Sequence, residues 1–173
     1  KEFWTSSPRH RSTPRVKKVG LGTIEKHAML FSPAFFERGK RGVAFQGLSD
    51  FIGASKFVEE GGLRACISLA RDDDQDLQCL AVAALRHLSL NDRIKRKIVE
   101  EGALQPLIAS GTSTNNLDLQ QQCAGTIANL TENARNQISI VEEGGFQALI
   151  SLSQVQDEVV QSDVSRAYAN ISS

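Results

Sequence analysis

Apolar residues in the C-terminal two thirds of the chain recur at spacings of three and four, the period of amphipathic helices rather than of strands. The clearest stretch begins where Asn91 can cap a short helix and ends at Gly102, which can supply a left-handed turn. A second helix is expected over about 103–109, and a polar loop at 111–116 then precedes a third helix over about 117–131. The third helix carries an apolar stripe formed by Leu119, Cys123, Ile127 and Leu130.

This three-helix unit is repeated along the chain. The segment VEEGGL at 58–63 recurs as VEEGAL at 99–104 and as VEEGGF at 141–146, at intervals of 41 and 42 residues. A second landmark near the end of each third helix follows the same period, at His87, Asn129 and Asn170. Helical solenoids have periods in this range, about 40–47 residues, so the sequence predicts stacked helical repeats that share one core.

The recurring turn, the Leu-x-x-Leu-Ile helix and the long helix that closes on Ala-Asn-Leu resemble armadillo repeats, most closely the vacuolar-scaffold and catenin-like kind. The resemblance covers residues 50–173 and implies an all-α, right-handed helical solenoid whose third helices line a concave groove. We expect repeats at about 58–98, 99–140 and 141–173, a degenerate capping half-repeat at 32–57, and an extended basic arm at 1–31.

In armadillo proteins this groove binds extended peptides, and one asparagine per repeat hydrogen-bonds the peptide backbone, since an amide offers both a donor and an acceptor. By resemblance Asn129 and Asn170 fill these positions, whereas His87 and Gln46 replace the asparagine. The alternative is that these side chains only satisfy neighbouring helix ends. The expected groove residues are Gln46, Arg86, His87, Gln122, Gly125, Asn129, Arg166 and Asn170.

Two better-known uses of such a groove are disfavoured. Nuclear-import adaptors of the family carry a tryptophan four residues before the asparagine, but here those positions hold Ala83, Gly125 and Arg166. The positive groove of the catenin kind, which binds acidic partners, is reduced to Arg86 and Arg166. We therefore expect neither an import adaptor nor a strongly basic groove.

The formal net charge of zero hides a split between the two parts of the chain. Residues 1–56 contain eleven Lys and Arg against four Asp and Glu, and residues 57–173 contain nine against sixteen. The split indicates a basic arm joined to an acidic domain. The cations at the centre of the arm are Arg9, Arg11, Arg15, Lys17 and Lys18. A second basic cluster, RIKRK at 93–97, is expected to be a solvated helix face, with phosphate or acidic-partner binding as the alternative.

The sequence contains no recognisable motif for catalysis, metal binding or cofactor binding. The three cysteines form no CxxC pair and have no ligand-like spacing to histidine, so they are expected in a helical core and favour a reducing compartment. The acidic run at 72–76 lacks the glycine and glutamate of a calcium loop and is expected to cap a helix. No histidine neighbours a recognisable nucleophile. We expect no enzyme activity, no cofactor and no metal.

The sequence thus favours a non-catalytic scaffold or adaptor that binds partner proteins, as extended segments or helices, in its concave groove. The alternative is a structural subunit of a large multiprotein or ribonucleoprotein assembly, anchored by the basic arm, which would be the only part to contact nucleic acid. In a third hypothesis the arm folds back onto the acidic solenoid.

No stretch is apolar enough to span a membrane, and the expected location is cytoplasmic. The Arg-, Ser- and Thr-rich start leaves an organellar location open. A solenoid that stops after a third helix, near Ile171, exposes an apolar end, which predicts either further sequence or a covering partner.

Overall fold

The computed structural model describes residues 51–173, and within this range all regular structure is α-helical. The helices follow one another as three triplets, each made of two short helices and one longer helix. The first triplet is α3 (Phe51–Glu59), α4 (Gly62–Leu69) and α5 (Gln75–Leu88). The second is α6 (Asp92–Glu100), α7 (Leu104–Thr112) and α8 (Leu117–Thr131). The third is α9 (Ala134–Glu142), α10 (Gly145–Leu152) and α11 (Glu158–Ile171).

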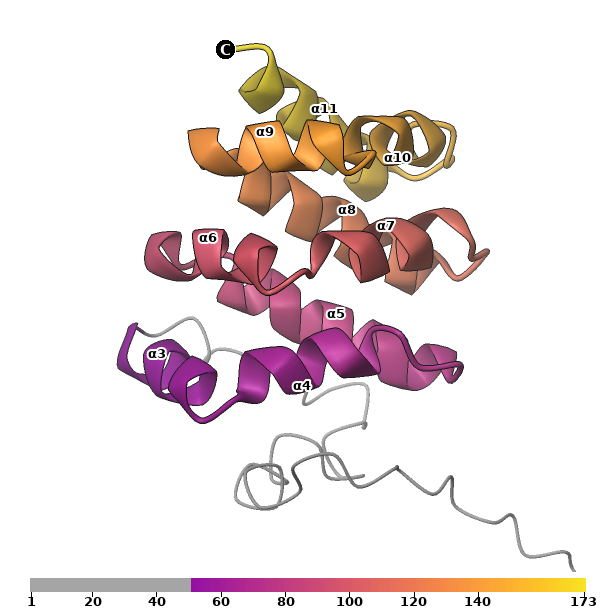
Figure 1. The fold of residues 1–173 in the computed structure, drawn as a ribbon. Coiled ribbons are helices and arrows are strands. Elements are labelled where there is room, and N and C mark those ends of the chain that lie inside the picture. The colour runs from indigo at the N-terminus through magenta and orange to yellow at the C-terminus, as the bar shows by residue number, and fades with distance from the viewer. Residues whose placement is uncertain (1–50) are drawn as a thin grey trace, which may run out of the picture.

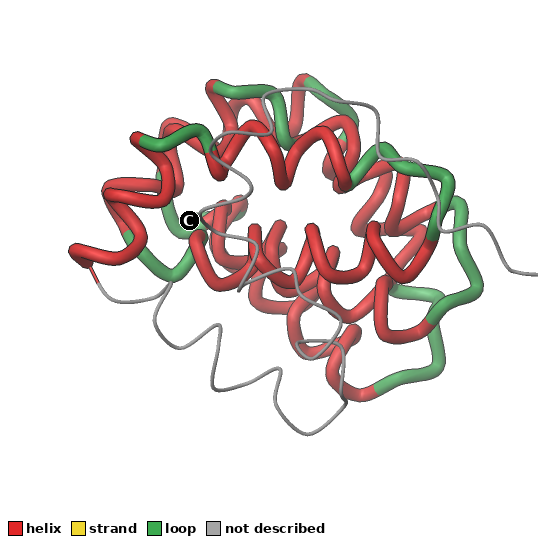
Figure 2. The backbone as a smooth tube through the Cα atoms, turned by 90° about the horizontal axis from the view of Figure 1, so that it is seen from below, coloured by secondary structure: helices red, strands yellow, loops and turns green. Residues whose placement is uncertain are grey.

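The triplets stack in chain order, from α3 at the bottom of Figure 1 to α11 at the top. The long helices form the centre of the stack, because α8 packs against α5 on one side and against α11 on the other. In the view along the stack, helices of successive triplets lie over one another and the loops lie at the periphery (Figure 2). The stack therefore places the three long helices side by side on one surface.

Polar caps begin most of these helices, as the sequence predicted for the second triplet. The side chain of Asn91 accepts a hydrogen bond from the backbone N–H of Arg93, and α6 follows. The acidic run at 72–76 caps α5 through Asp74, whose carboxylate accepts from two backbone N–H groups of the first turn. Both predictions are confirmed, and both caps satisfy N–H groups that a helix start otherwise leaves unpaired.

A glycine in left-handed conformation separates the first two helices of every triplet. Gly61, Gly102 and Gly144 have φ angles of 88°, 82° and 88°. Residues other than glycine rarely adopt this backbone conformation, because their Cβ atom clashes with the main chain. The recurrence of glycine in the VEEG segment therefore has a steric cause. The predicted turn at Gly102 is confirmed, and the predicted third helix at 117–131 agrees with α8. The second helix is longer than predicted, since α7 continues to Thr112.

The core is aliphatic and continuous through all three triplets. Its largest fully buried side chains come from every helix from α4 to α10: they are Leu63, Leu85, Leu88, Ile98, Leu104, Leu107, Leu119, Ile127, Leu130, Ile140, Leu149 and Leu152. Cys66 and Cys123 lie in the same core as free thiols, as expected from the sequence. Because no triplet could bury these side chains alone, the stack folds as one unit.

Helix packing groups the residues differently from the sequence motif. The starts that we assigned to the repeats, at 58, 99 and 141, fall inside the first helix of each triplet. Of the expected capping segment, residues 51–57 belong to α3, and the remainder lies outside the described residues together with the basic arm. Within residues 51–173 no helix is both long and apolar enough to cross a membrane.

Candidate functional site

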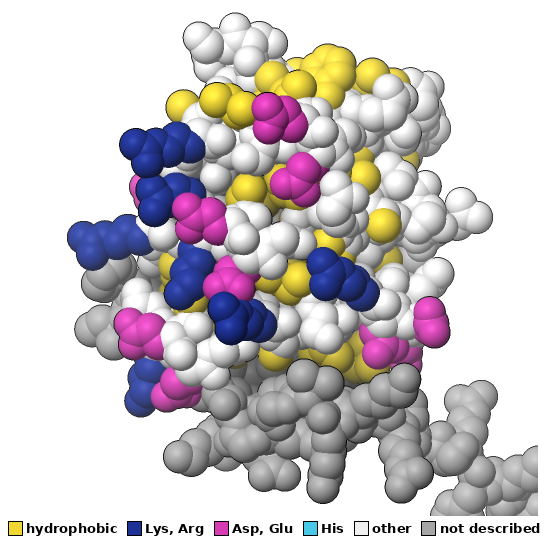
Figure 3. Space-filling model, viewed as in Figure 1, with side chains coloured by type: hydrophobic (Ala, Val, Ile, Leu, Met, Phe, Trp, Pro, Cys, Tyr) yellow, Lys and Arg dark blue, Asp and Glu magenta, His cyan; other side chains and the backbone are white. Residues whose placement is uncertain are grey.

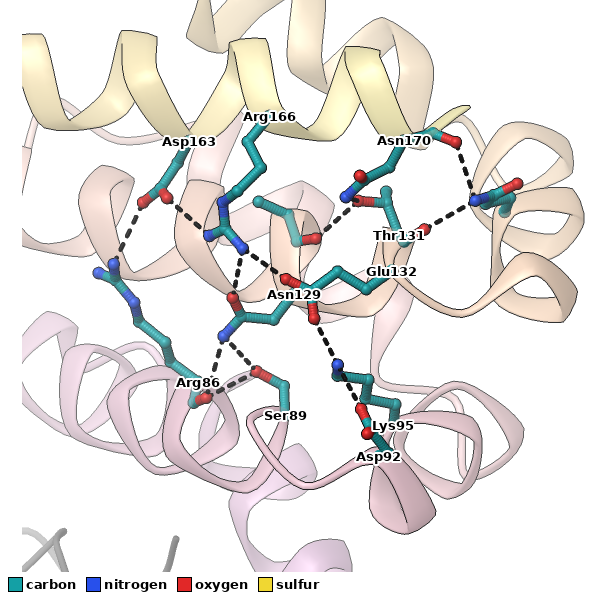
Figure 4. A network of polar contacts seen from close by, with 12 residues as sticks. Arg86, Ser89, Asp92, Lys95, Asn129, Thr131, Glu132, Asp163, Arg166 and Asn170 are labelled. Carbon is teal, nitrogen blue, oxygen red and sulfur yellow. Dashed lines mark hydrogen bonds and ion pairs between the residues drawn. The ribbon is translucent and has the colours of Figure 1, made fainter. Parts of the chain in front are cut away.

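The surface formed by α5, α8 and α11 carries every groove residue that was predicted within the described range. Gln46 lies outside that range, as do Arg9, Arg11, Arg15, Lys17 and Lys18 of the arm. We call this surface the long-helix face. A network of polar contacts on it spans all three triplets (Figure 4).

Arg86 of α5 crosses the second triplet and reaches the third. Its Nη2 lies 3.1 Å from Oδ2 of Asp163 on α11, and its Nη1 donates to the backbone oxygen of Gln121 on α8. Gly125 makes this path possible, since a Cβ placed there would lie 2.4 Å from Cζ of Arg86. The guanidinium therefore occupies the space that a side chain at position 125 would fill. The glycine at position 125, where nuclear-import adaptors carry a tryptophan, thus leaves room for an arginine of the preceding triplet.

Asn129 is used inside the protein rather than presented to solvent. Its residue is only 4% exposed. Its Nδ2 donates to Oγ of Ser89 at 2.9 Å, and its Oδ1 accepts from Nη1 of Arg166 at 2.9 Å. Arg166 also pairs with Asp163 at 2.8 Å, so one carboxylate holds two guanidinium groups. Both ends of the Asn129 amide are thus engaged between triplets, the arrangement that the alternative interpretation of these asparagines describes.

The network continues from Arg166 to the first helix of the second triplet. Glu132 accepts from Arg166 at 2.9 Å and also from Nζ of Lys95. Lys95 donates a further hydrogen bond, of 2.7 Å, to Asp92. Burial by itself lowers the pKa of the Lys95 ammonium, but the hydrogen bonds and charges of Asp92 and Glu132 outweigh it and raise that pKa above its usual 10.5.

For Lys95 the prediction of a solvated basic face was wrong. The residue is 4% exposed, and it pairs with Asp92 of its own helix and with Glu132 at the end of α8. The other cations of this cluster are exposed: Arg93, Arg96 and Lys97. Basic side chains gather with acidic ones on the left of Figure 3, over α6 and α9. Arg96 pairs with Glu100 at 2.9 Å there, so this side is a mixed-charge surface.

Besides Arg86 and Arg166, three predicted groove residues are partly exposed on the long-helix face. Gln122 is partly exposed, and none of the hydrogen bonds within residues 51–173 uses its side-chain amide. His87 is also partly exposed, with Nδ1 2.9 Å from the backbone oxygen of Ala83. Asn170 donates through Nδ2 to Oγ1 of Thr131 at 3.0 Å. These positions offer polar atoms to a ligand more readily than Asn129 does.

Asp163 and Ser89 are the residues that sequence reasoning missed. Asp163 is a buried acid on α11, and Ser89 is a buried hydroxyl after α5. A signal existed for Asp163, since an acid three residues before Arg166 is at ion-pair spacing on a helix. No signal pointed to its second partner, Arg86, which is 77 residues away in sequence.

The possible metal ligands and the cysteine thiols were located on the described part of the chain. Within residues 51–173 no group of three or more His, Cys, Asp or Glu side chains could hold a metal ion. Burial raises the pKa of the Cys66 thiol to about 12 and also raises that of Cys123. These thiols are therefore protonated at neutral pH, and a buried, protonated thiol is a core side chain rather than a nucleophile.

Comparison with known proteins gives structural neighbours only. No protein-family model matches the sequence, and no curated protein matches it. A designed armadillo repeat protein is 24% identical, with a TM-score of 0.68 over 74% of this chain and 55% of its own. The armadillo repeats only protein of Plasmodium falciparum is 17% identical, with a TM-score of 0.62 over 95% of this chain and 67% of its own.

The fold is an armadillo-type helical solenoid. The predicted fold class is thereby confirmed for the described residues, whereas the vacuolar-scaffold or catenin-like subtype stays a prediction. Another designed armadillo repeat protein, solved in complex with the peptide (KR)4, is 23% identical, with a TM-score of 0.68 over 86% of this chain and 62% of its own. This armadillo-type chain spans 55% and 62% of the lengths of the two designed proteins.

Proposed function

We propose that this chain is a non-catalytic scaffold that binds an extended segment of a partner protein along the long-helix face. The observation that carries the proposal is the side-by-side packing of α5, α8 and α11, which presents one continuous surface across three repeats. A designed protein of the same fold has been solved with a peptide bound. A ligand that runs across the repeats could meet polar side chains at regular intervals along this surface.

The partly exposed side chains suggest how the segment would be held. His87, Gln122 and Asn170 come from α5, α8 and α11, so each repeat places a partly exposed polar side chain on this face. Arg86 and Arg166 are about a third exposed at the side-chain level and retain N–H groups beyond those used in the network. Backbone carbonyls or acidic side chains of a segment could accept from them. Asn129 would serve by holding Arg166 in place.

The test is affinity capture from native extract, with the full chain and with a double variant, His87→Glu and Gln122→Glu. Both side chains are partly exposed, so we expect the variant to fold and to lose the partners that the unaltered chain recovers. The matched control is Arg93→Glu with Arg135→Glu, on the exposed side of α6 and α9. Capture that is unchanged by the first pair and lost with the control pair would refute the proposal.

The second candidate is a structural subunit anchored by the basic arm, favoured by the excess of Lys and Arg in residues 1–56. Removing residues 1–31 separates it from the scaffold proposal. If recovery depends on the arm, it should also weaken steeply with salt, as binding through Lys and Arg does. If both versions recover the same partners, the long-helix face or another face of the repeats carries the function. The cytoplasmic location stays a prediction in either case.

A further inference from the structure

The centre of the long-helix face holds hydrogen-bond donors that the described chain does not use. Arg86 and Arg166 are both turned toward Asp163 there (Figure 4). A guanidinium group carries five N–H bonds. Within residues 51–173 Arg86 donates two hydrogen bonds and Arg166 donates three, so half of their N–H bonds stay available. Both side chains reach solvent, with exposed fractions of 28% and 39%.

The two carboxylates at the same place are already engaged by cations of this chain. Oδ2 of Asp163 accepts from Arg86, and its Oδ1 accepts from Arg166. Oε1 of Glu132 accepts from Arg166, and its Oε2 accepts from Lys95. A ligand that brings cations would therefore compete for carboxylates that are already paired. A ligand that brings acceptors would instead meet unused N–H bonds.

The distribution of charge in the network favours the same kind of ligand. Three cations of the network are opposed by three carboxylates, but one of these, Asp92, lies on α6 with its side chain 90% exposed. Solvent screens a carboxylate in that position, so it compensates little of the charge at the long helices. On the long helices a single carboxylate, Asp163, joins two guanidinium groups. An additional anion beside these two groups is therefore attracted to them.

A third donor lies on the helix between the two arginines. Gln122 holds the place on α8 that Asp163 holds on α11, seven residues before the repeat asparagine in each case. The backbone oxygen of the preceding residue, Gln121, accepts from Nη1 of Arg86, so the arginine passes beside this position. Gln122 is partly exposed, and its side-chain amide makes no hydrogen bond within the described range. It can donate to the same ligand as the arginines.

We propose that the centre of the long-helix face is a subsite for one Asp or Glu side chain of the bound segment, with Arg86 and Arg166 as its donors. The inference rests on the proposed function, since it names the chemistry of the segment that this face would bind. A carboxylate accepts two parallel N–H bonds from a guanidinium group, a stronger contact than a backbone carbonyl makes. A basic segment, such as the (KR)4 peptide of the designed protein, would place like charges against each other.

The test is selection of binding peptides from a displayed library of random sequences, with the full chain as the bait. We expect the selected peptides to share an Asp or Glu at one position. Replacing that residue by Gln should raise the dissociation constant at least about tenfold, as loss of a charge-assisted hydrogen bond does, and replacing it by Lys should raise it further. These changes are made in the peptide, so they do not affect folding of the chain.

Variants of the chain connect the acidic residue of the peptide to the two arginines. Arg86→Gln and Arg166→Gln each leave Asp163 with one cation, and each should reduce the effect of the Glu-to-Gln change in the peptide, as a double-mutant cycle measures. If either variant does not fold, Arg86→Lys or Arg166→Lys keeps the charge, removes the forked donor and should still weaken the acidic peptide. The matched control, Arg93→Gln with Arg135→Gln on α6 and α9, should leave every affinity unchanged.

The outcomes separate this subsite from the proposed function. Selected peptides that share no acidic residue overturn the subsite and leave peptide binding in place. The same holds if the Glu-to-Gln change costs as much in the arginine variants as in the unaltered chain, or if (KR)4 binds as tightly as the acidic peptides. Selection that yields no binding peptide refutes the proposed function, and the subsite with it.

Discussion

Arg86 in the first triplet and Asp163 in the third form an ion pair of 3.1 Å that passes over Gly125 in the second. Contacts in repeat proteins usually join neighbouring repeats only, so a contact between the first and third repeats is an addition to the nearest-neighbour pattern. It ties the three long helices together, and it places a guanidinium group in the middle of the surface that we propose for peptide binding.

Asp163→Asn should destabilise the fold by about 1–2 kcal/mol, because it removes the carboxylate that Arg86 and Arg166 share. The loss is expected to be smaller than for a fully buried pair, since both arginines are partly exposed and solvent screens them. Urea denaturation followed by circular dichroism measures it. Ser162→Asn, at the exposed neighbouring position, is the control. An Asp163→Asn variant as stable as that control would contradict the assigned role.

Gly125→Ala should change the free energy of unfolding in opposite directions in the unaltered chain and in an Arg86→Ala variant. In the unaltered chain the new Cβ would lie 2.4 Å from Cζ of Arg86, so it must displace the guanidinium and disturb its ion pair. In an Arg86→Ala background that conflict is absent, and replacing a mid-helix glycine should stabilise the chain by about 1 kcal/mol. A double-mutant cycle on unfolding free energies measures the coupling. Equal effects in the two backgrounds would show that Arg86 does not occupy this space.

Asn129→Ala should affect folding more than binding. It removes the hydrogen bonds that the Asn129 amide donates to the buried Ser89 hydroxyl and accepts from Arg166, at a cost of about 1–3 kcal/mol. Gln122→Ala, on the same helix but partly exposed, should change the free energy of unfolding by no more than about 0.5 kcal/mol. Parallel denaturation and capture experiments check both. If Asn129→Ala abolishes capture at unchanged stability, Asn129 contacts the ligand directly.

The Lys95 ion pairs should make stability fall at high pH. Its pKa in the folded chain is above the usual 10.5, so the folded state favours the protonated form. The contribution is complete below pH 10.5 and disappears as the pH rises through the higher folded value. We expect the stability difference between the unaltered chain and Lys95→Met to change as the pH passes 10.5, in the direction that disfavours the unaltered chain.

Denaturation of both proteins at neutral pH and above 10.5 measures this difference. Ionisation of the cysteines affects both proteins alike and cancels in the comparison. A difference that stays constant with pH would mean that Lys95 is not held as a charged, paired group.

Only one of the three cysteines should react quickly in the folded chain. Cys66 and Cys123 are buried, and burial raises the pKa of Cys66 to about 12, so neither is accessible as a thiolate. Cys79 is partly exposed. A colourimetric thiol reagent should therefore detect one fast group in the native chain and all three in denaturant, and Cys79→Ser should remove the fast phase. Two or three fast groups would indicate local opening of the core.

Much of the fold was predictable because its signals are local. The cap at Asn91, the left-handed turn at Gly102 and the helix over 117–131 depend on residues a few positions apart, and the structure confirms all three. The period of 41 and 42 residues then identified the stack, since a repeated unit with one apolar side buries it only against its neighbours.

The arrangement of the long-helix face was not predictable in the same way. The sequence alone could not distinguish an asparagine that faces a ligand from one that joins two helices, and Asn129 does the latter in the described chain. Nor could it show that Lys95, among four cations, is the buried one.

The sequence by itself thus determined the helices, their period and their aliphatic core, because these follow from caps, glycine turns and spacing within one unit. Tertiary structure alone decided the pairing of Arg86 with Asp163 and the burial of Lys95 against Glu132. The physical reason is distance along the chain. The two ion pairs join residues 77 and 37 positions apart, so their geometry exists only once the helices have packed together.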